Sequence, residues 1–104
     1  MALVKATFLL PVNDNDGRDL LPEIHEAQIG LWDRFKAYTN EGEVKGAYLM
    51  ADGSQATDTH PKFTLVLEDA RLGELEELLR KFKAKTAQEM IYLEILRGVE
   101  LRLL

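Results

Sequence analysis

The sequence predicts an α+β sandwich in which two amphipathic helices cover one face of a four-stranded antiparallel sheet. Apolar residues recur with period two in four segments and with the helical period in two others, in the order strand, helix, strand, strand, helix, strand. Each predicted helix has a single apolar stripe, and each central strand has one strongly apolar face to receive it. In chain order, the six segments are residues 3–12, 19–35, 43–51, 62–69, 70–85 and 89–96.

Strict alternation predicts the first strand, residues 3–12, because successive side chains of a strand point to opposite faces of the sheet. The apolar set is Val4, Ala6, Phe8 and Leu10, and the mixed set is Lys5, Thr7 and Leu9. Pro11 lacks a backbone N–H and ends regular pairing.

A helical stripe follows in residues 19–35. It is formed by Ile24, Ala27, Gln28, Leu31, Trp32 and Phe35. Asp19 is expected to cap the start of this helix, and Pro22 is tolerated in the first turn. Gly30 weakens the middle of the helix, and we expect it to permit close packing on the sheet.

Residues 37–53 contain tyrosine, threonine and valine, and the second strand is predicted for residues 43–51, with some irregularity before it. We expect Gly46 to mark a bulge or a close approach of backbones. Residues 51–61 are polar and are expected to form a long connection that begins with a turn at Asp52 and Gly53.

The second half of the chain gives the clearest patterns. Residues 62–69 alternate, and the apolar face holds Phe63, Leu65 and Leu67. Residues 70–85 form a helix with a narrow stripe, Leu72, Leu75, Leu79 and Phe82. Residues 89–96 alternate again, with Ile91, Leu93 and Ile95 on one face. A short extra strand is predicted for residues 99–104, after a tight turn at Arg97 and Gly98.

This order of elements is that of two split β-α-β units, which form a ferredoxin-like βαββαβ sandwich. Right-handed crossovers would then give the strand order 4-1-3-2. The 104 residues are enough for one core, so residues 1–104 are expected to form a single domain.

Composition excludes several classes of function. The net charge of −5 argues against binding to nucleic acid, which needs a basic face, and against docking on anionic lipid. There is no cysteine, which excludes thiol catalysis and thiolate metal sites and favours a reducing compartment. No apolar run is long enough to span a membrane. We therefore expect a cytoplasmic protein.

The predicted sheet has a second face, which no helix covers. It would carry Lys5, Thr7, Leu9, Thr64, Val66, Glu68, Met90, Tyr92 and Glu94. This mixture suits a homodimer interface formed by two stacked sheets. It also suits a small-molecule cleft lined by Tyr48, Tyr92 and Glu94. The two readings are compatible, because clefts often form at such interfaces.

Residues 12–23 resemble a calcium loop, with Gly17 at the sixth position and Glu23 at the twelfth. The first position, however, is Val12, where calcium needs an oxygen ligand. A strand rather than a helix precedes the segment. We therefore interpret it as an Asx-rich turn that leads into a helix, and no metal or other cofactor is expected.

Polar side chains at the ends of the second and fourth strands could converge on a ligand. The candidate ligand-binding residues are Thr39, Glu43, Tyr48, Gln88, Tyr92 and Glu94. His60 and Asp58 could form a general-base pair, but a histidine in a polar connection before Pro61 is more typically solvated. No glycine-rich phosphate loop is present in the sequence.

An aromatic residue, then Thr39, then Gly42 precede the second strand, and Gln88 and Glu89 open the fourth. This arrangement resembles small uncharacterised bacterial ferredoxin-like domains, over the last two-thirds of the chain. The resemblance supports the fold and implies no activity. From the residues themselves we expect a homodimeric module that binds a small molecule or a protein partner. The alternative is a small acid–base enzyme that uses Glu94 or Glu43 with a tyrosine.

Overall fold

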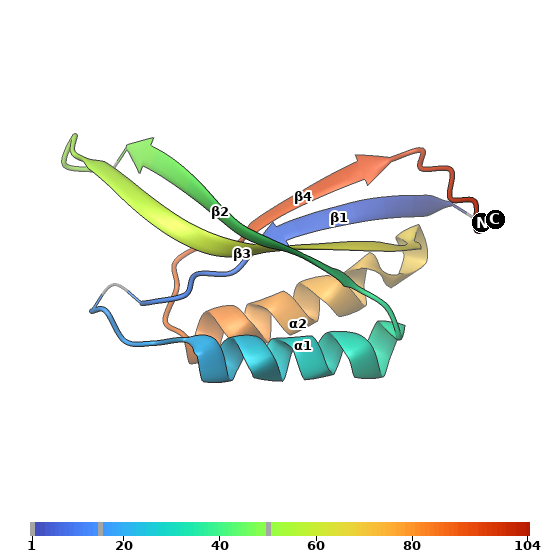
Figure 1. Cartoon of the computed structure of the whole chain (residues 1–104), viewed down its shortest axis with the longest axis horizontal. Helices are drawn as coiled ribbons and strands as arrows, with labels where there is room; N and C mark the ends of the chain where they lie inside the picture. The colour runs from blue at the N-terminus through green and yellow to red at the C-terminus, as the bar shows by residue number, and fades with distance from the viewer. Residues whose placement is uncertain (1, 15, 50) are drawn as a thin grey trace.

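The computed structural model describes residues 2–14, 16–49 and 51–104. Four strands and two helices follow one another along the chain (Figure 1). They are β1 (Leu3–Leu9), α1 (Leu21–Phe35), β2 (Thr39–Leu49), β3 (Gln55–Glu68), α2 (Leu72–Lys85) and β4 (Tyr92–Arg97), with a 3-10 turn at Asp69–Arg71 before α2. Both helices lie on the same side of the sheet (Figure 1).

The sheet confirms the predicted topology. Its strand order is β2-β3-β1-β4, which is 4-1-3-2 read from the other edge, and every neighbouring pair is antiparallel. Thr7 on β1 lies between Thr64 on β3 and Glu94 on β4. The structure is therefore the ferredoxin-like sandwich that the sequence predicts.

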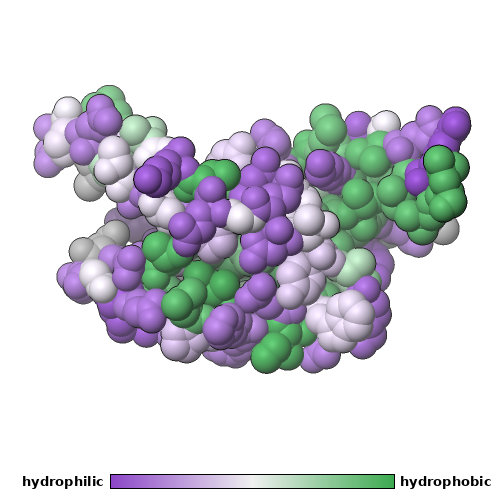
Figure 2. All heavy atoms as spheres, viewed as in Figure 1, coloured by the Kyte–Doolittle hydropathy of each residue, from purple (hydrophilic) through white to green (hydrophobic). Residues whose placement is uncertain are grey.

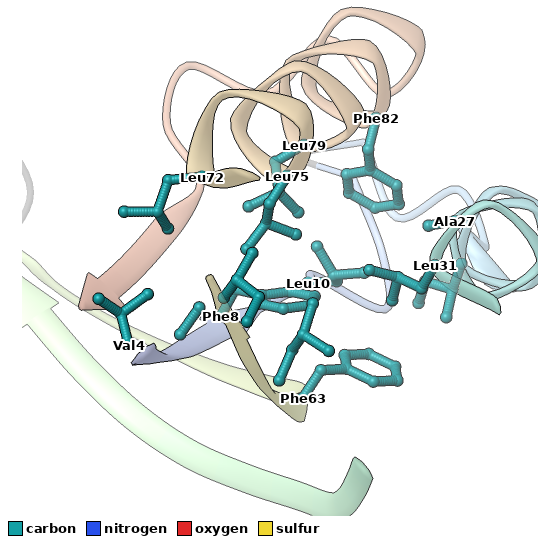
Figure 3. Packing of buried hydrophobic residues seen from close by; sticks show 14 residues of the cluster. Val4, Phe8, Leu10, Ala27, Leu31, Phe63, Leu72, Leu75, Leu79 and Phe82 are labelled. Atoms are coloured by element: carbon teal, nitrogen blue, oxygen red, sulfur yellow. The ribbon is translucent and has the colours of Figure 1, made fainter. Parts of the chain in front are cut away.

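The core lies between the helices and the sheet (Figure 3). β1 and β3 contribute their alternate apolar residues, and the rings of Phe8 and Phe63 stack with centroids 5.7 Å apart. The predicted stripe of α2 is buried in full, as are Ile24, Ala27 and Leu31 of α1. Burial of a large apolar side chain stabilises the fold by about 1.5–3 kcal/mol, so this cluster is the main reason that the sequence adopts one structure.

The start of α1 differs slightly from the prediction. Asp19 does not occupy the cap position, which belongs to Leu20, but its Oδ1 accepts a hydrogen bond from the N–H of Leu21 at 3.0 Å. Gly30 does allow a close approach, but to the other helix rather than to the sheet. A Cβ at this position would lie 3.0 Å from Cδ1 of Leu78 on α2. Trp32, predicted beside the stripe, is 54% exposed.

The β2–β3 hairpin is much longer than predicted. β3 begins at Gln55, so most of residues 51–61 are strand and not connection, and β2 begins already at Thr39. The ribbon projects beyond the helices (Figure 1), so both of its faces can carry polar side chains and the apolar alternation disappears. The predicted turn is present, with Gly53 at φ +87°. The register shift lies between Asn40 and Glu43 rather than at Gly46.

The predicted extra strand at the C-terminal end is wrong. β4 ends at Arg97, and Gly98 turns the chain with φ +72°. Residues 99–104, all within the described part of the chain, lie outside any strand. Their alternation is that of a strand, but within this chain they have no neighbouring strand with which to pair. Among the described residues, no helix is long and apolar enough to cross a membrane.

Candidate functional site

The face of the sheet opposite the helices is the candidate site, and we call it the open face. It carries Lys5, Thr7, Leu9, Thr64, Val66, Glu68, Tyr92, Glu94 and Leu96, which alternate with core residues and share cross-strand registers. Met90, which the sequence placed on this face, lies before β4 and is 82% exposed. The open face is thus a real surface with the predicted membership in β3, β1 and β4.

A polar row crosses the middle of the open face. Thr39, Thr64, Thr7 and Glu94 stand side by side on β2, β3, β1 and β4. Apolar groups flank this row on both sides. Toward one end of the strands, Leu9 of β1 lies opposite Tyr92 of β4. Toward the other end, Lys5 of β1 lies between Val66 of β3 and Leu96 of β4. The surface therefore combines hydroxyl and carboxylate hydrogen-bonding groups with apolar area that water covers poorly.

Tyr92 and Glu94 are brought together as predicted. They lie two residues apart on β4, and the Tyr92 hydroxyl donates a hydrogen bond to Oε2 of Glu94 at 3.0 Å. This hydrogen bond and the negative charge of Glu94 raise the pKa of Tyr92 above its usual value. At neutral pH the phenol is therefore protonated. Its one O–H is given to Glu94, so the pair can hold a ligand through the acceptor sites of the phenol oxygen and of the second carboxylate oxygen.

Other predicted site residues are not brought to this pair. Thr39 and Glu94 lie at opposite ends of the polar row, separated by three strand spacings, or about 14 Å. Glu43 lies opposite Pro61 on the other face of the ribbon. The six predicted residues do not form one pocket.

Gln88 also has a local role away from the open face. Its backbone N–H donates to the carbonyl of Lys83 at 3.1 Å, and its Nε2 donates to the carbonyl of Thr86 at 3.3 Å. These bonds satisfy free carbonyls where α2 ends. The side chain closes a helix end and does not point to the Tyr92–Glu94 pair.

Tyr48 belongs to a second group, which lies on the β2–β3 ribbon. Cross-strand register places it with Asp58 and His60 on the ribbon face that continues the open face. Nε2 of His60 lies 3.8 Å from Oδ2 of Asp58, and the charge of Asp58 is the main cause of a raised pKa of Tyr48. Nδ1 of His60 is buried and has no hydrogen-bond partner among the described residues.

This ribbon group was only partly visible in the sequence. The Asp58–His60 pair was recognised, but residues 51–61 were interpreted as a connection. Only the strand register of Gln55–Glu68 shows that Tyr48 shares their face.

The segment that resembles a calcium loop is a hydrogen-bonded turn. Oδ1 of Asp14 accepts bonds from the N–H groups of Asp16 and Arg18. The guanidinium of Arg18 lies between the two carboxylates that calcium would need, 3.2 Å from Asp14 and 2.8 Å from Glu23. Among the described residues, no group of three or more His, Cys, Asp and Glu side chains could hold a metal ion.

Two hollows mark the surface. A groove of about 300 Å³ runs between α1 and α2 and is lined by charged residues with Ile29 and Leu78. A wider hollow of about 660 Å³ lies where β2 leaves β3, and we call it the edge hollow. Its lining consists of Trp32, Ala37, Tyr38, Thr39, Thr64, Leu65, Val66, Leu101 and Leu103. It is continuous with the open face through Thr64 and Val66.

Comparisons with known proteins identify the fold and not a family. No protein-family model matches the sequence, and no curated protein matches it. Among solved structures, CutA1 from Oryza sativa has a TM-score of 0.69 at 10% identity, covering 98% of this chain and 84% of its own. The divalent ion tolerance protein CutA1 from Ehrlichia chaffeensis has a TM-score of 0.66 at 8% identity, covering 96% and 84%.

A third solved structure is a protein related to NIF3 from Bacillus cereus, with a TM-score of 0.63 at 9% identity. The match covers 95% of this chain but only 26% of that one, so the same architecture can form one part of a larger protein. At these identities the likenesses concern the path of the backbone. The chain therefore has the sandwich architecture of CutA1.

Proposed function

We propose that this chain is a single-domain binding module that pairs with a second copy of itself through the open face. The observation that carries the proposal is the asymmetry of the sheet. Helices bury one face, whereas the other presents apolar side chains that are largely accessible on β4. Tyr92 is 52% exposed and Leu96 is 61% exposed. A chain without cysteine suits this role in the reducing cytoplasm.

Physical chemistry supports a sheet-to-sheet contact. Two stacked sheets lie about 10 Å apart, which is close enough for the side chains of both inner faces to interdigitate. The flanking apolar groups, Leu9 with Tyr92 and Val66 with Leu96, would supply the hydrophobic contribution. The hydroxyl of Thr7 and the carboxylate of Glu94 could hydrogen-bond across a two-fold axis, so these groups of the polar row would not be left unsatisfied.

The Tyr92–Glu94 pair is where we place a small-molecule or protein ligand. It lies on the edge strand β4, at the rim of the proposed contact, where clefts between subunits form. A phenol oxygen and a carboxylate oxygen that can both accept suit a partner with hydrogen-bond donors, such as an amide or a hydroxylated metabolite.

The alternative is an acid–base enzyme at the same pair. The observation in its favour is the 3.0 Å bond from Tyr92 to Glu94, since general acids and bases work at hydrogen-bond distance. With a raised pKa, Tyr92 could act as a proton donor and not as a base near neutral pH. Substituting Tyr92→Phe would abolish such an activity but would leave self-association intact.

Methyl NMR spectra recorded at increasing protein concentration test the proposal. Methyl signals of Leu9, Val66 and Leu96 should shift or broaden as copies associate, because their environment changes from water to protein. The methyl groups of Ile29 and Leu78, in the groove between the helices, serve as internal controls and should not change. Changes confined to the helix layer would contradict pairing through the open face.

A further inference from the structure

The sheet lacks a strand beside the end of β3. β2 pairs with β3 only as far as Thr64, whereas β3 continues to Glu68 alongside β1. Residues 65–68 therefore have a partner on one side only among the described strands. The edge hollow, which Leu65 and Val66 line, lies there, and its lining also includes Trp32, Tyr38, Leu101 and Leu103. The free edge of β3 is thus bordered by apolar and aromatic side chains.

Alternate residues of β3 direct their backbone N–H and C=O groups to opposite sides of the strand, and this alternation identifies the groups that have no partner strand. Leu10 donates to the carbonyl of Pro61, and Asp69 donates to the carbonyl of Ala2, which fixes the bonded pairs between β1 and β3. Bonded pairs alternate in an antiparallel ladder, so Leu65 and Leu67 direct their N–H and C=O groups to β1. Val66 and Glu68 direct theirs to the edge hollow.

Residues 99–104 have the chemistry of the missing strand. Val99, Leu101 and Leu103 alternate with Glu100 and Arg102, and the segment lies outside any helix or strand. Both leucines line the edge hollow, while Arg102 lies beside Glu100 on the other side at 2.7 Å. Apolar side chains gather at this end of the molecule, where both termini lie (Figure 2). Leu103 and Leu104 are 90% and 116% exposed.

The segment can reach the free edge of its own copy only with its last residues. From β4 it must pass β1 and β3, three strand spacings or about 14 Å, which takes about four extended residues. Of residues 98–104, about three would remain to pair. The same segment of a second copy meets no such limit and can pair along its whole length.

We infer that residues 99–104 of one copy add as an edge strand beside residues 65–68 of another, and that the exchange is reciprocal. In this arrangement the backbone groups of Val66 and Glu68 gain partners, and Leu101 and Leu103 cover Leu65 and Trp32. The polar side chains then lie on the side of Glu68, where Arg102 complements its charge. The inference rests on the proposed pairing of two copies but assigns it a separate contact.

Amide hydrogen exchange of the full-length protein tests the inference at single residues. On raising the protein from about 10 μM to about 1 mM, exchange of the Val66 and Glu68 amides should slow at least about tenfold. The amides of Leu65 and Leu67, bonded to β1, are the internal control and should be protected at both concentrations.

Two neighbouring substitutions provide a matched pair. Leu103→Glu places a charge on the covered side of the added strand and should remove the concentration-dependent protection. Leu104→Glu makes the same change on the outer side and should preserve it. Both leucines are exposed within one copy, so neither change should prevent folding.

The possible results separate this inference from the proposed function. Protection of Val66 and Glu68 that does not depend on concentration would show pairing within one copy and would overturn the inference. Unprotected Val66 and Glu68 amides in a protein of twice the chain mass would also overturn the inference. Pairing through the open face would then still stand. Protection that survives Leu103→Glu would also contradict it.

Discussion

Leu96→Glu should weaken self-association strongly without weakening the fold of one copy. Leu96 lies on β4 directly opposite Lys5, and 61% of its surface is accessible. Burial of a whole leucine side chain contributes about 1.5–3 kcal/mol, so the accessible part would contribute about 1–2 kcal/mol per copy. A two-fold interface contains this contact twice, which gives about 2–4 kcal/mol. The dissociation constant should therefore rise about 30- to 1000-fold.

Sedimentation velocity over a range of concentrations measures this change, and thermal unfolding of the dilute protein measures the fold. The new carboxylate faces Lys5, and an opposite-charge pair across two strands contributes about 0.2–1 kcal/mol, so the single copy should be no less stable. Leu49→Glu is the matched control. Leu49 is 78% exposed in β2, opposite Gln55 and on the other face of the ribbon. Equal dissociation constants for the two variants and the unmodified protein would refute the reasoning.

Four further predictions concern the fold and the turn before α1. Phe8→Ala should lower the free energy of unfolding by about 3–5 kcal/mol in urea titrations, because Phe8 is fully buried and stacked in the core; a loss below about 1 kcal/mol would contradict that placement. Thr86→Val should cost about 1 kcal/mol, because the buried hydroxyl donates to the carbonyl of Phe82 at 2.7 Å; unchanged stability would show that this bond contributes nothing. The pKa of the Asp14 carboxyl is lowered in the folded protein, chiefly because it accepts a hydrogen bond from the N–H of Arg18. These bonds therefore stabilise the fold fully at a pH above the pKa that Asp14 has in the unfolded chain. That stability is lost as the pH falls through the lower pKa that Asp14 has in the folded protein. Asp14→Asn should therefore be less stable than the unmodified protein at pH 7 and equally stable in strong acid, as thermal melts at each pH would show; a difference that persists in acid would contradict this. Added calcium should leave the melting temperature unchanged, since Arg18 lies between the carboxylates.

The architecture could be predicted because its signals are local and periodic. The stripe of α2 and the alternation of β1, β3 and β4 show which side chains face the core, and so they identify these elements. Once the elements are known, the rules for their connections give the strand order. The register of the open face could be predicted for the same reason. Thr7, Thr64 and Glu94, which the alternation places on one face, are direct neighbours in the register.

The failures occur where strands have no buried face. The outer half of the β2–β3 ribbon is surrounded by water, so threonine and aspartate alternate with other polar residues and no period indicates a strand. Residues 99–104 show the reverse case. Their alternation is real, but it indicates a strand only where a neighbouring edge is available, and one copy provides such an edge only for the last residues of the segment.

The candidate site was predicted only in part. Tyr92 and Glu94 were placed together because they are two residues apart on one strand. The sequence alone does not show that the amide of Gln88 donates to the carbonyl of Thr86 at the end of α2. Tyr48 was assigned to the sheet cleft, but its charged neighbour is Asp58 on the ribbon. Long-range partners of this kind depend on the register, and a local pattern does not determine it.

Sedimentation equilibrium of the unmodified protein tests the central claim most directly. The chain mass is 11.8 kDa, and pairing through the open face predicts a weight-average mass that rises with concentration and levels off at twice this value. A mass that stays at 11.8 kDa up to about millimolar concentration, or that levels off at another multiple, would contradict two-fold pairing.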